Sequence, residues 1–212
     1  MLHKVISEII EENDWRDREF TRLKVNSSNV EEILWCRMSI PMIYAHWEGF
    51  VVNSLKILIE HLNSLSLDPL NASINLVVTG LGDNYKSLSG KQSFQQRITF
   101  TNNFHNLLKS SLKLSKKIDT KSNLKSSVLA EICEIFSFNM ESFNPYTADI
   151  DRIVNIRNSI AHGENAYQVN MENITKYITS VTGAIDTLLV EIDDFIKQKK
   201  IFTPPAKLNS TT

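Results

Sequence analysis

Residues 157–162 read Arg-Asn-Ser-Ile-Ala-His, and Gly163 follows them directly. This hexapeptide brings a permanent cation, an amide and an imidazole within one and a half turns of a helix. The guanidinium of Arg157 can form two parallel hydrogen bonds to the oxygens of a phosphate. The imidazole of His162 belongs to the side-chain type best suited to giving or taking a proton at neutral pH. Asn158 can bond a phosphate or hold His162 in one tautomer. These residue types can bind an anion such as a phosphate and can transfer a proton.

The hexapeptide ends a stretch with strong helical periodicity. Ile150, Ile153, Val154 and Ala161 recur at the spacing of one apolar helix face. Arg157 comes three residues after Val154 and four before Ala161, so we expect it to lie on that face. A charged side chain rarely faces a core unless it is paired or meets a ligand. The position of Arg157 therefore favours a functional interpretation.

Arg157 and His162 do not project from one side of a regular helix. They are about 140° apart around the axis and about 7.5 Å apart along it. Two arrangements could still bring both onto one substrate: the helix ends at Gly163 and His162 turns back, or two copies of the helix meet across a two-fold axis. The spacing does not choose between them. The structural alternative is that both side chains only bond the last carbonyls and offset the helix dipole.

The Arg-x4-His pattern resembles the signature of the HEPN superfamily, and Asn158 and the continuation Ala161-His162-Gly163-Glu164 strengthen the resemblance. It covers about residues 5–200 and implies an all-α fold: an up-and-down helical bundle of about six or seven helices, with the signature on a late helix. It also implies a nuclease that cuts RNA without a metal, and a dimer in which Arg157 and His162 of both chains line one groove.

A second group of candidate residues lies in the aromatic stretch 41–50. Tyr44 and Glu48 are four residues apart on a flank of its apolar stripe, and His46 lies on another side. Several HEPN families carry an acidic residue on such an early helix. The resemblance therefore suggests that Glu48 neutralises and orients Arg157, with His46 as a further supporting residue. The alternatives are a solvated Glu48, a His46 satisfied within the fold, and Tyr44 and Trp47 as core residues.

Composition describes an ordinary globular protein. The chain has 212 residues, 42% of them hydrophobic, and a formal net charge of −1, so any contact with RNA must come from local patches. Cys36 and Cys133 are far apart in the sequence and fit two reduced thiols better than a disulfide or a metal site. With no apolar stretch long enough for a membrane and no signal-peptide core at the start, we expect a cytoplasmic location.

Period 3.6 dominates the chain and predicts one helical domain over residues 1–202. Ser28 and Glu31 form a capping-box signal for the second helical run, in which Pro41 should break or kink the helix. Asn144-Pro145 reads as a turn, and Asn170 as the cap of the last helix. The expected helices span residues 2–23, 28–64, 93–114, 124–138, 148–162 and 170–200.

The middle of the chain is less specific, and residues 66–122 read as an elaboration of the bundle. Residues 74–78 fit a short strand or a helical turn. Residues 80–82, Gly-Leu-Gly, lack the third glycine and the βαβ context of a dinucleotide loop. Lysines 116, 117, 121 and 125 form either a solvated linker or a track for RNA. Residues 203–212 should be a disordered tail.

The functional expectation is a metal-independent endoribonuclease that cuts RNA by attack of the 2′-hydroxyl, acting as a toxin or phage-defence effector. Arg157, His162 and Asn158 are its candidate catalytic residues, and Glu48 and His46 support them. The expected partners are RNA, a second copy, and an antitoxin or nucleotidyltransferase. The alternative is a non-catalytic module that binds RNA or a nucleotide, or that dimerises and regulates a partner. His3, His61 and His105 lack companions at metal-ligand spacing, and no cofactor is expected.

Overall fold

The computed structural model describes residues 3–82 and 90–203. Within these ranges the chain forms α-helices, short 3-10 helices and one isolated β-bridge between Ala72 and Phe202. The all-α prediction is confirmed. None of the helices described there has both the length and the apolar character that a membrane crossing requires.

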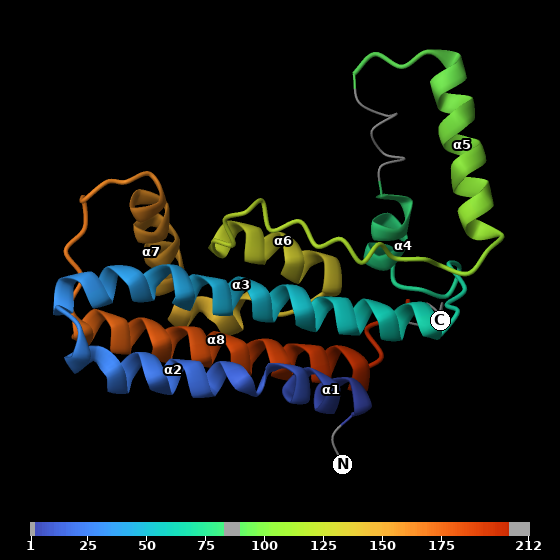
Figure 1. Ribbon diagram of the computed structural model, residues 1–212. Helices are drawn as coiled ribbons and strands as arrows, with labels where there is room; N and C mark the ends of the chain where they lie inside the picture. Colours follow the sequence, from blue (N-terminus) through green and yellow to red (C-terminus); the bar gives the residue numbers. More distant parts are fainter. Residues whose placement is uncertain (1–2, 83–89, 204–212) are drawn as a thin grey trace, which may run out of the picture.

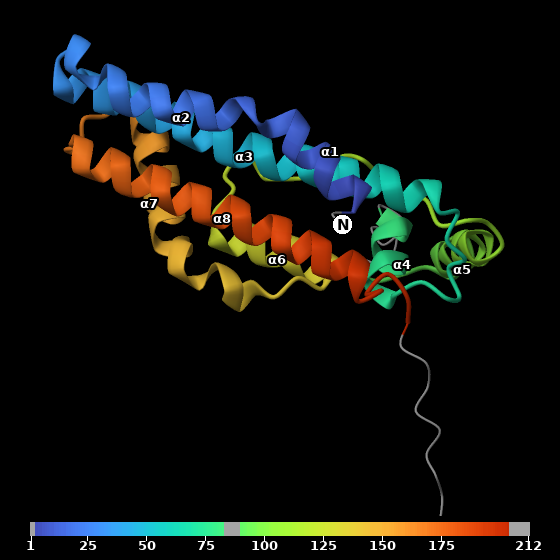
Figure 2. The same cartoon turned by 90° about the horizontal axis from the view of Figure 1, so that it is seen from below.

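Four helices lie side by side and form the long bundle (Figures 1 and 2). A single residue, Asp14, separates the first two, so the pair corresponds to the one N-terminal helix that the periodicity predicts. Counted in this way, the described helices agree with the expected six or seven. The four are α1 (Lys4–Asn13), α2 (Trp15–Val25), α3 (Glu32–Ser64) and α8 (Met171–Lys197).

Helix α3 begins and continues differently from the prediction. Residues Asn26–Asn29 form a 3-10 helix, and the N-cap of α3 is Glu31 without a side-chain cap, so the capping box at Ser28 is wrong. The helix also runs unbroken through Pro41. Ile40 and Ile43, on either side of the proline, are fully buried. Packing on both sides of the proline offsets the hydrogen bond that Pro41 cannot donate.

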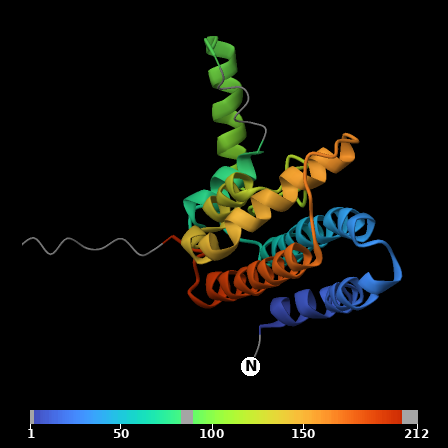
Figure 3. The ribbon, with the colours of Figure 1, turned by 90° about the vertical axis from the view of Figure 1, so that its left-hand side faces the viewer.

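Helix α7 (Asn144–Ala161) carries the candidate hexapeptide and packs on both α3 and α8. It begins four residues earlier than predicted, after a 3-10 helix at Met140–Phe143. Asn144-Pro145 begins a helix and does not form a loop turn. Proline is favoured at the start of a helix, because a backbone N–H at that position has no acceptor within the helix. Figure 3 looks at the end of the bundle where α7 finishes and the chain descends to α8.

Residues 74–78 are helical, within α4 (Ile74–Leu81). Helix α5 (Phe94–Leu108) projects away from the bundle (Figures 1 and 3) and buries none of its residues. It ends before the predicted residue 114, because Leu112 and Leu114 enter the core from an extended segment. Helix α6 (Ser126–Phe136) then returns to the bundle. The interpretation of residues 66–122 as an elaboration stays a prediction, which the projection of α5 supports.

The described residues after α8 are held in place one residue further than expected, by the loop between α3 and α4. Asn170 caps α8 in a capping box, as predicted, and α8 ends at Lys197. Thr203, assigned to the tail, donates its backbone N–H to Asn71 and its hydroxyl to the carbonyl of Ala72. The remaining residues of the predicted disordered tail, 204–212, lie outside the described residues.

Candidate functional site

The candidate hexapeptide ends α7 in a Schellman motif. Gly163 has φ +75° and donates its N–H to the carbonyl of Ile160, while Glu164 donates to the carbonyl of Ser159. These two bonds are the pattern that glycine permits just past a helix end. His162 is therefore the C-cap residue, and its side chain is exposed. The helix thus ends just before Gly163, as in the first of the two arrangements that the spacing leaves open.

The apolar face of α7 is shifted by one position at its end. Ile150, Ile153 and Val154 are buried as predicted, but Ala161 is exposed. Ile156 is buried instead, and Ile160 packs partly against the core. The helix therefore turns its last alanine away from the bundle.

Arg157 is half-buried and lies over the ring of Tyr44 on α3, with 4.7 Å between its guanidinium carbon and the ring centroid. It also donates to Oδ1 of Asn158 at 2.9 Å. In turn, Nδ2 of Asn158 donates to Oδ1 of Asn123 at 2.7 Å. An aromatic face and an amide oxygen thus receive the cation, and neither carries a negative charge.

The segment between α5 and α6, residues 109–125, crosses α3 and holds this cluster; we call it the α5–α6 segment. Its Leu124 N–H donates to the Tyr44 hydroxyl at 3.0 Å, and its Thr120 hydroxyl donates to Oε1 of Glu48 at 2.6 Å. Burial, together with a hydrogen bond and charge from Glu48, raises the pKa of Tyr44 to about 12, although the Leu124 bond and Arg157 act in the opposite direction. Tyr44 therefore stays neutral and serves as the surface on which Arg157 rests.

One predicted pairing is wrong, and one of the two roles open to Asn158 is not seen. Glu48 does not neutralise Arg157, because its carboxylate is engaged by Thr120 and Tyr44, and within the described residues no ion pair joins it to the guanidinium. Asn158 does not hold the tautomer of His162, because its amide bonds Arg157 and Asn123. Glu48 still belongs to the cluster, one side chain removed from Arg157.

His46 faces α2 and takes no part in this cluster. Its Nε2 lies 3.1 Å from Oε2 of Glu19, and its Nδ1 lies 3.3 Å from a guanidinium nitrogen of Arg16. Since the guanidinium can only donate, Nδ1 is the acceptor and the ring proton is on Nε2. Burial and then the charge of Arg16 lower the pKa of His46, against the influence of Glu19. His46 is a satisfied histidine of the α2–α3 interface, and its assignment as a supporting site residue is wrong.

The sequence did not identify three residues that hold the site. From the sequence, Tyr44 reads as a core residue or a stacking platform, and no sequence signal singles out Asn123. Arg37 on α3 donates to Oδ1 of Asn165 at 2.7 Å and to the carbonyl of Glu164 at 3.0 Å, which fixes the turn after His162. Arg37 and Tyr44 are seven residues apart and share one face of α3. The seven-residue spacing of Arg37 and Tyr44 can be read from the sequence. The loop residues that these two side chains contact cannot.

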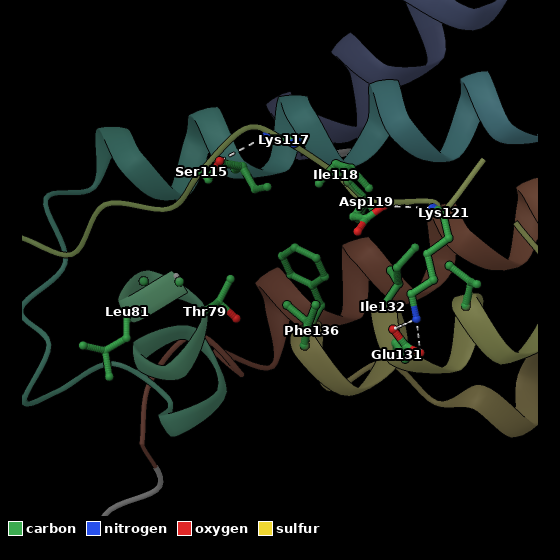
Figure 4. Close-up of a pocket in the computed structure, with 16 residues that line it drawn as sticks. Thr79, Leu81, Ser115, Lys117, Ile118, Asp119, Lys121, Glu131, Ile132 and Phe136 are labelled. Atoms are coloured by element: carbon green, nitrogen blue, oxygen red, sulfur yellow. Dashed lines mark hydrogen bonds and ion pairs between the residues drawn. The ribbon is translucent and has the colours of Figure 1, made fainter. Parts of the chain in front are cut away.

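A cavity of about 680 Å³ lies between α3, α4, α6 and the α5–α6 segment (Figure 4). Ile118, Ile132 and Phe136 line it, and Lys121 at its rim pairs with Glu131. None of the predicted site residues lines this cavity. Lys121 is thus already engaged, as is Lys116, which pairs with Glu60. Among the described residues no group of three or more His, Cys, Asp or Glu side chains is placed to hold a metal ion.

Comparison with known proteins places the chain in a family. Neither the curated proteins nor the solved structures gave a match. The family model described as RiboL-PSP-HEPN matches residues 11–198, from the end of α1 to the residue after α8. The match covers the chain from the last residues of α1 through α8 and includes both parts of the candidate site. The chain therefore belongs to the RiboL-PSP-HEPN family of the HEPN superfamily.

Proposed function

We propose that the protein is a metal-independent endoribonuclease that cuts RNA by attack of a 2′-hydroxyl on the adjacent phosphate. One observation carries the proposal. Arg157 is half-buried, yet within the described chain it has no carboxylate partner and rests on the Tyr44 ring and the Asn158 amide. A partly desolvated guanidinium held by neutral groups keeps its charge available for an anion. A phosphate is the anion that its planar fork fits.

The groups at the end of α7 supply the remaining chemistry. His162, exposed at the helix end, removes the proton from the 2′-hydroxyl while the bond from O2′ to phosphorus forms. The bond from phosphorus to O5′ then breaks, and the leaving O5′ takes a proton from an imidazolium. Arg157 stabilises the charge that builds up on the phosphoryl oxygens. The products are a 2′,3′-cyclic phosphate and a 5′-hydroxyl.

A homodimer would let the two His162 side chains divide the base and acid roles. Leu34, Met38 and Met42 are 42–53% exposed and, at four-residue spacing, form one stripe on α3. This stripe lies beside the face that carries Arg37 and Tyr44. An exposed apolar stripe next to a polar site is typical of a surface that a partner covers. We therefore propose that the dimer interface comprises this stripe and the exposed end of α7.

Light scattering tests the dimer. The wild-type chain should have the mass of a dimer at micromolar concentration, and Met38→Glu should be a monomer with greatly reduced cleavage. Val190→Glu is the matched control, since Val190 is 59% exposed, close to the 53% of Met38, but lies on α8. A monomeric wild type would refute the two-chain site.

The nuclease itself is tested with a fluorescently labelled RNA in the presence of EDTA. Cleavage should persist without divalent ions and leave a cyclic phosphate at the new 3′ end. Arg157→Gln should lower the rate by about 10²-fold or more, because it removes the charge that stabilises the transition state. Products with a 3′-hydroxyl, or activity that EDTA abolishes, would contradict the mechanism.

The wider role that we propose is that of a toxin or phage-defence effector with a neutralising partner. Such a protein would act in the cytoplasm, where its two buried, unpaired cysteines remain reduced. Expression of the wild type should arrest growth, whereas His162→Ala should be tolerated at the same protein level. The alternative, a non-catalytic module that regulates a partner, is favoured by one feature: within the described residues the His162 imidazole has no partner that fixes its tautomer. Growth arrest by the His162→Ala variant would support that alternative.

A further inference from the structure

A second cleft, of about 560 Å³, opens beside the end of the candidate hexapeptide. It lies between the first turn of α3, the loop from α7 to α8 and the first residues of α8, at the end of the bundle that faces the viewer in Figure 3. Its lining combines polar and apolar side chains. The residues that matter here are Glu32, Ile33, Asn165, Tyr167, Gln168 and Asn170.

The cleft is fixed to the candidate site. Asn165 comes three residues after His162, so their Cα atoms are at most about 11 Å apart. Arg37 bonds both Glu164 and Asn165, and thereby holds the wall of the cleft against α3. A strand of RNA whose phosphate lies at His162 would therefore have a neighbouring base within reach of this cleft, because stacked nucleotides follow one another at about 3.4 Å.

The polar groups of the cleft are already oriented by the fold. Oδ1 of Asn165 accepts from Arg37, Oδ1 of Asn170 accepts from the N–H of Asn173, and Oε1 of Glu32 accepts from the N–H of Met171. Within the described residues this leaves the Asn165 and Asn170 Nδ2 groups, the Gln168 amide and Oε2 of Glu32 without partners. The cleft thus presents one carboxylate acceptor among several amide donors.

That pattern matches one base better than the others. Guanine presents two adjacent donors, N1–H and the N2 amino group, beside an acceptor, O6; a carboxylate can accept from both donors while an amide donates to O6. Uracil presents a single donor between two acceptors. Adenine and cytosine place an acceptor ring nitrogen beside their amino group, where a carboxylate would repel it.

The cleft also has surfaces for the face of a base. Ile33 is 62% exposed, although it is a large apolar residue at the wall of the cleft. Tyr167 is half-buried and is held by the guanidinium of Arg152, 4.6 Å from its ring centroid. Bases of single-stranded RNA are recognised by such contacts to the face together with hydrogen bonds to the edge.

From this arrangement we infer that the cleft binds a guanine base, with Glu32 accepting from N1–H and the N2 amino group and with Asn165 and Gln168 donating to O6. The inference rests on the proposed nuclease function insofar as the guanine belongs to the RNA that is cut. In that case the cleft sets the cleavage preference. A free guanine nucleotide offers the same edge, and the two sources are separated experimentally.

The RNA arm of the experiment maps cut sites in a pool of random RNA by sequencing the fragments that carry new 5′-hydroxyl ends. Guanine should be enriched at one fixed position near the cut for the wild type. Among the sites that the Glu32→Gln variant cuts, guanine should no longer be enriched at that position. Glutamine replaces one acceptor oxygen with a donor but keeps an oxygen for the Met171 N–H. Glu31→Gln, a change of the neighbouring exposed residue outside the cleft, should keep both the enrichment and the rate. Enrichment of another base, none at all, or enrichment that survives Glu32→Gln overturns the inference.

The nucleotide arm does not depend on cleavage. Titration of the His162→Ala protein with GMP, followed by calorimetry, should show saturable binding about tenfold or more tighter than that of AMP, because a bidentate pair discriminates between bases to that extent. Glu32→Gln should remove the difference. If GMP binds in this way but no RNA is cut, the guanine site stands and the nuclease fails. If RNA is cut without base enrichment and GMP does not bind, the nuclease stands and the guanine site is wrong.

Discussion

The guanidinium of Arg157 rests on the face of Tyr44, and the hydroxyl of the same tyrosine accepts a hydrogen bond from the α5–α6 segment. One side chain of α3 therefore joins the charged end of α7 to the segment that crosses both helices. A cation over an aromatic face gains about 0.5–2 kcal/mol. Because Tyr44 is only 2% exposed, its hydroxyl bond to the buried Leu124 N–H also matters for stability.

Two substitutions separate these contributions. Tyr44→Phe keeps the ring but leaves the N–H of Leu124 without its acceptor, which should cost about 1–3 kcal/mol in the free energy of unfolding while the cleavage rate changes little. Tyr44→Leu also removes the ring, so the cleavage rate should fall as Arg157 loses its support. Urea unfolding and single-turnover cleavage measure the two quantities. Equal cleavage rates for the two variants would show that the ring does not position Arg157.

His162→Ala should abolish RNA cleavage without unfolding the protein. The side chain is exposed at a helix end, and truncation there should cost about 1 kcal/mol or less. Loss of a general acid or base lowers a rate by about 10²- to 10⁴-fold. His105→Ala, which changes another exposed histidine, is purified in the same way as a control and should cleave RNA like the wild type. A variant as active as the wild type would remove His162 from the mechanism.

Gly163→Ala should destabilise the protein by about 1–2 kcal/mol, because φ is +75° at this position and a Cβ atom disfavours that conformation. No heavy atom lies within 4 Å of the added Cβ, so the effect comes from the backbone alone. Gly163→Asn should recover part of the loss, since asparagine tolerates this region best among the other residues. Thermal melts of the three proteins give the order, and a loss from asparagine as large as that from alanine would contradict the backbone explanation.

Glu48 should be coupled to Thr120 more strongly than to Arg157. The Thr120 hydroxyl donates to its carboxylate at 2.6 Å, whereas Arg157 is reached only through Tyr44. Double-mutant cycles of Glu48→Gln with Thr120→Val and with Arg157→Lys compare the two, and contacting pairs in such cycles show about 0.5–3 kcal/mol. A larger coupling with Arg157 would restore the ion pair expected from the sequence.

The pH dependence of stability should reveal His46. Its pKa is lowered in the folded protein, chiefly by burial and by Arg16, so the unfolded chain binds a proton at higher pH than the folded chain does. This contribution to stability is present above the unfolded pKa of about 6.5 and is lost as the pH falls through the folded pKa. Melting temperatures should therefore drop from pH 7.5 to pH 5.5, and the drop should be smaller for His46→Gln.

The helical periodicity of the sequence predicted most of the bundle, because apolar spacing directly reflects which face of a helix is buried. It failed where two signals compete: Asn144-Pro145 fits a turn and a helix start equally well, and Pro41 does not break a helix that is packed on both sides. The apolar context identified Arg157 as unusual. Its partners could not be found in this way, because Asn123 and Thr120 lie in a segment without periodicity, and only the path of the chain brings them to α7 and α3.

The contacts of the α5–α6 segment also bear on the stage of folding at which the candidate site forms. Thr120 meets a residue 72 positions away, Asn123 one 35 positions away, and Leu124 one 80 positions away. Contacts between such distant positions form late in folding, because long loops must close first. A chain that has formed its helices but has not yet laid this segment across them holds Arg157 without its anchored amide. The proposed activity would therefore appear after the helices form, and local opening of the segment would interrupt it while the bundle stays folded.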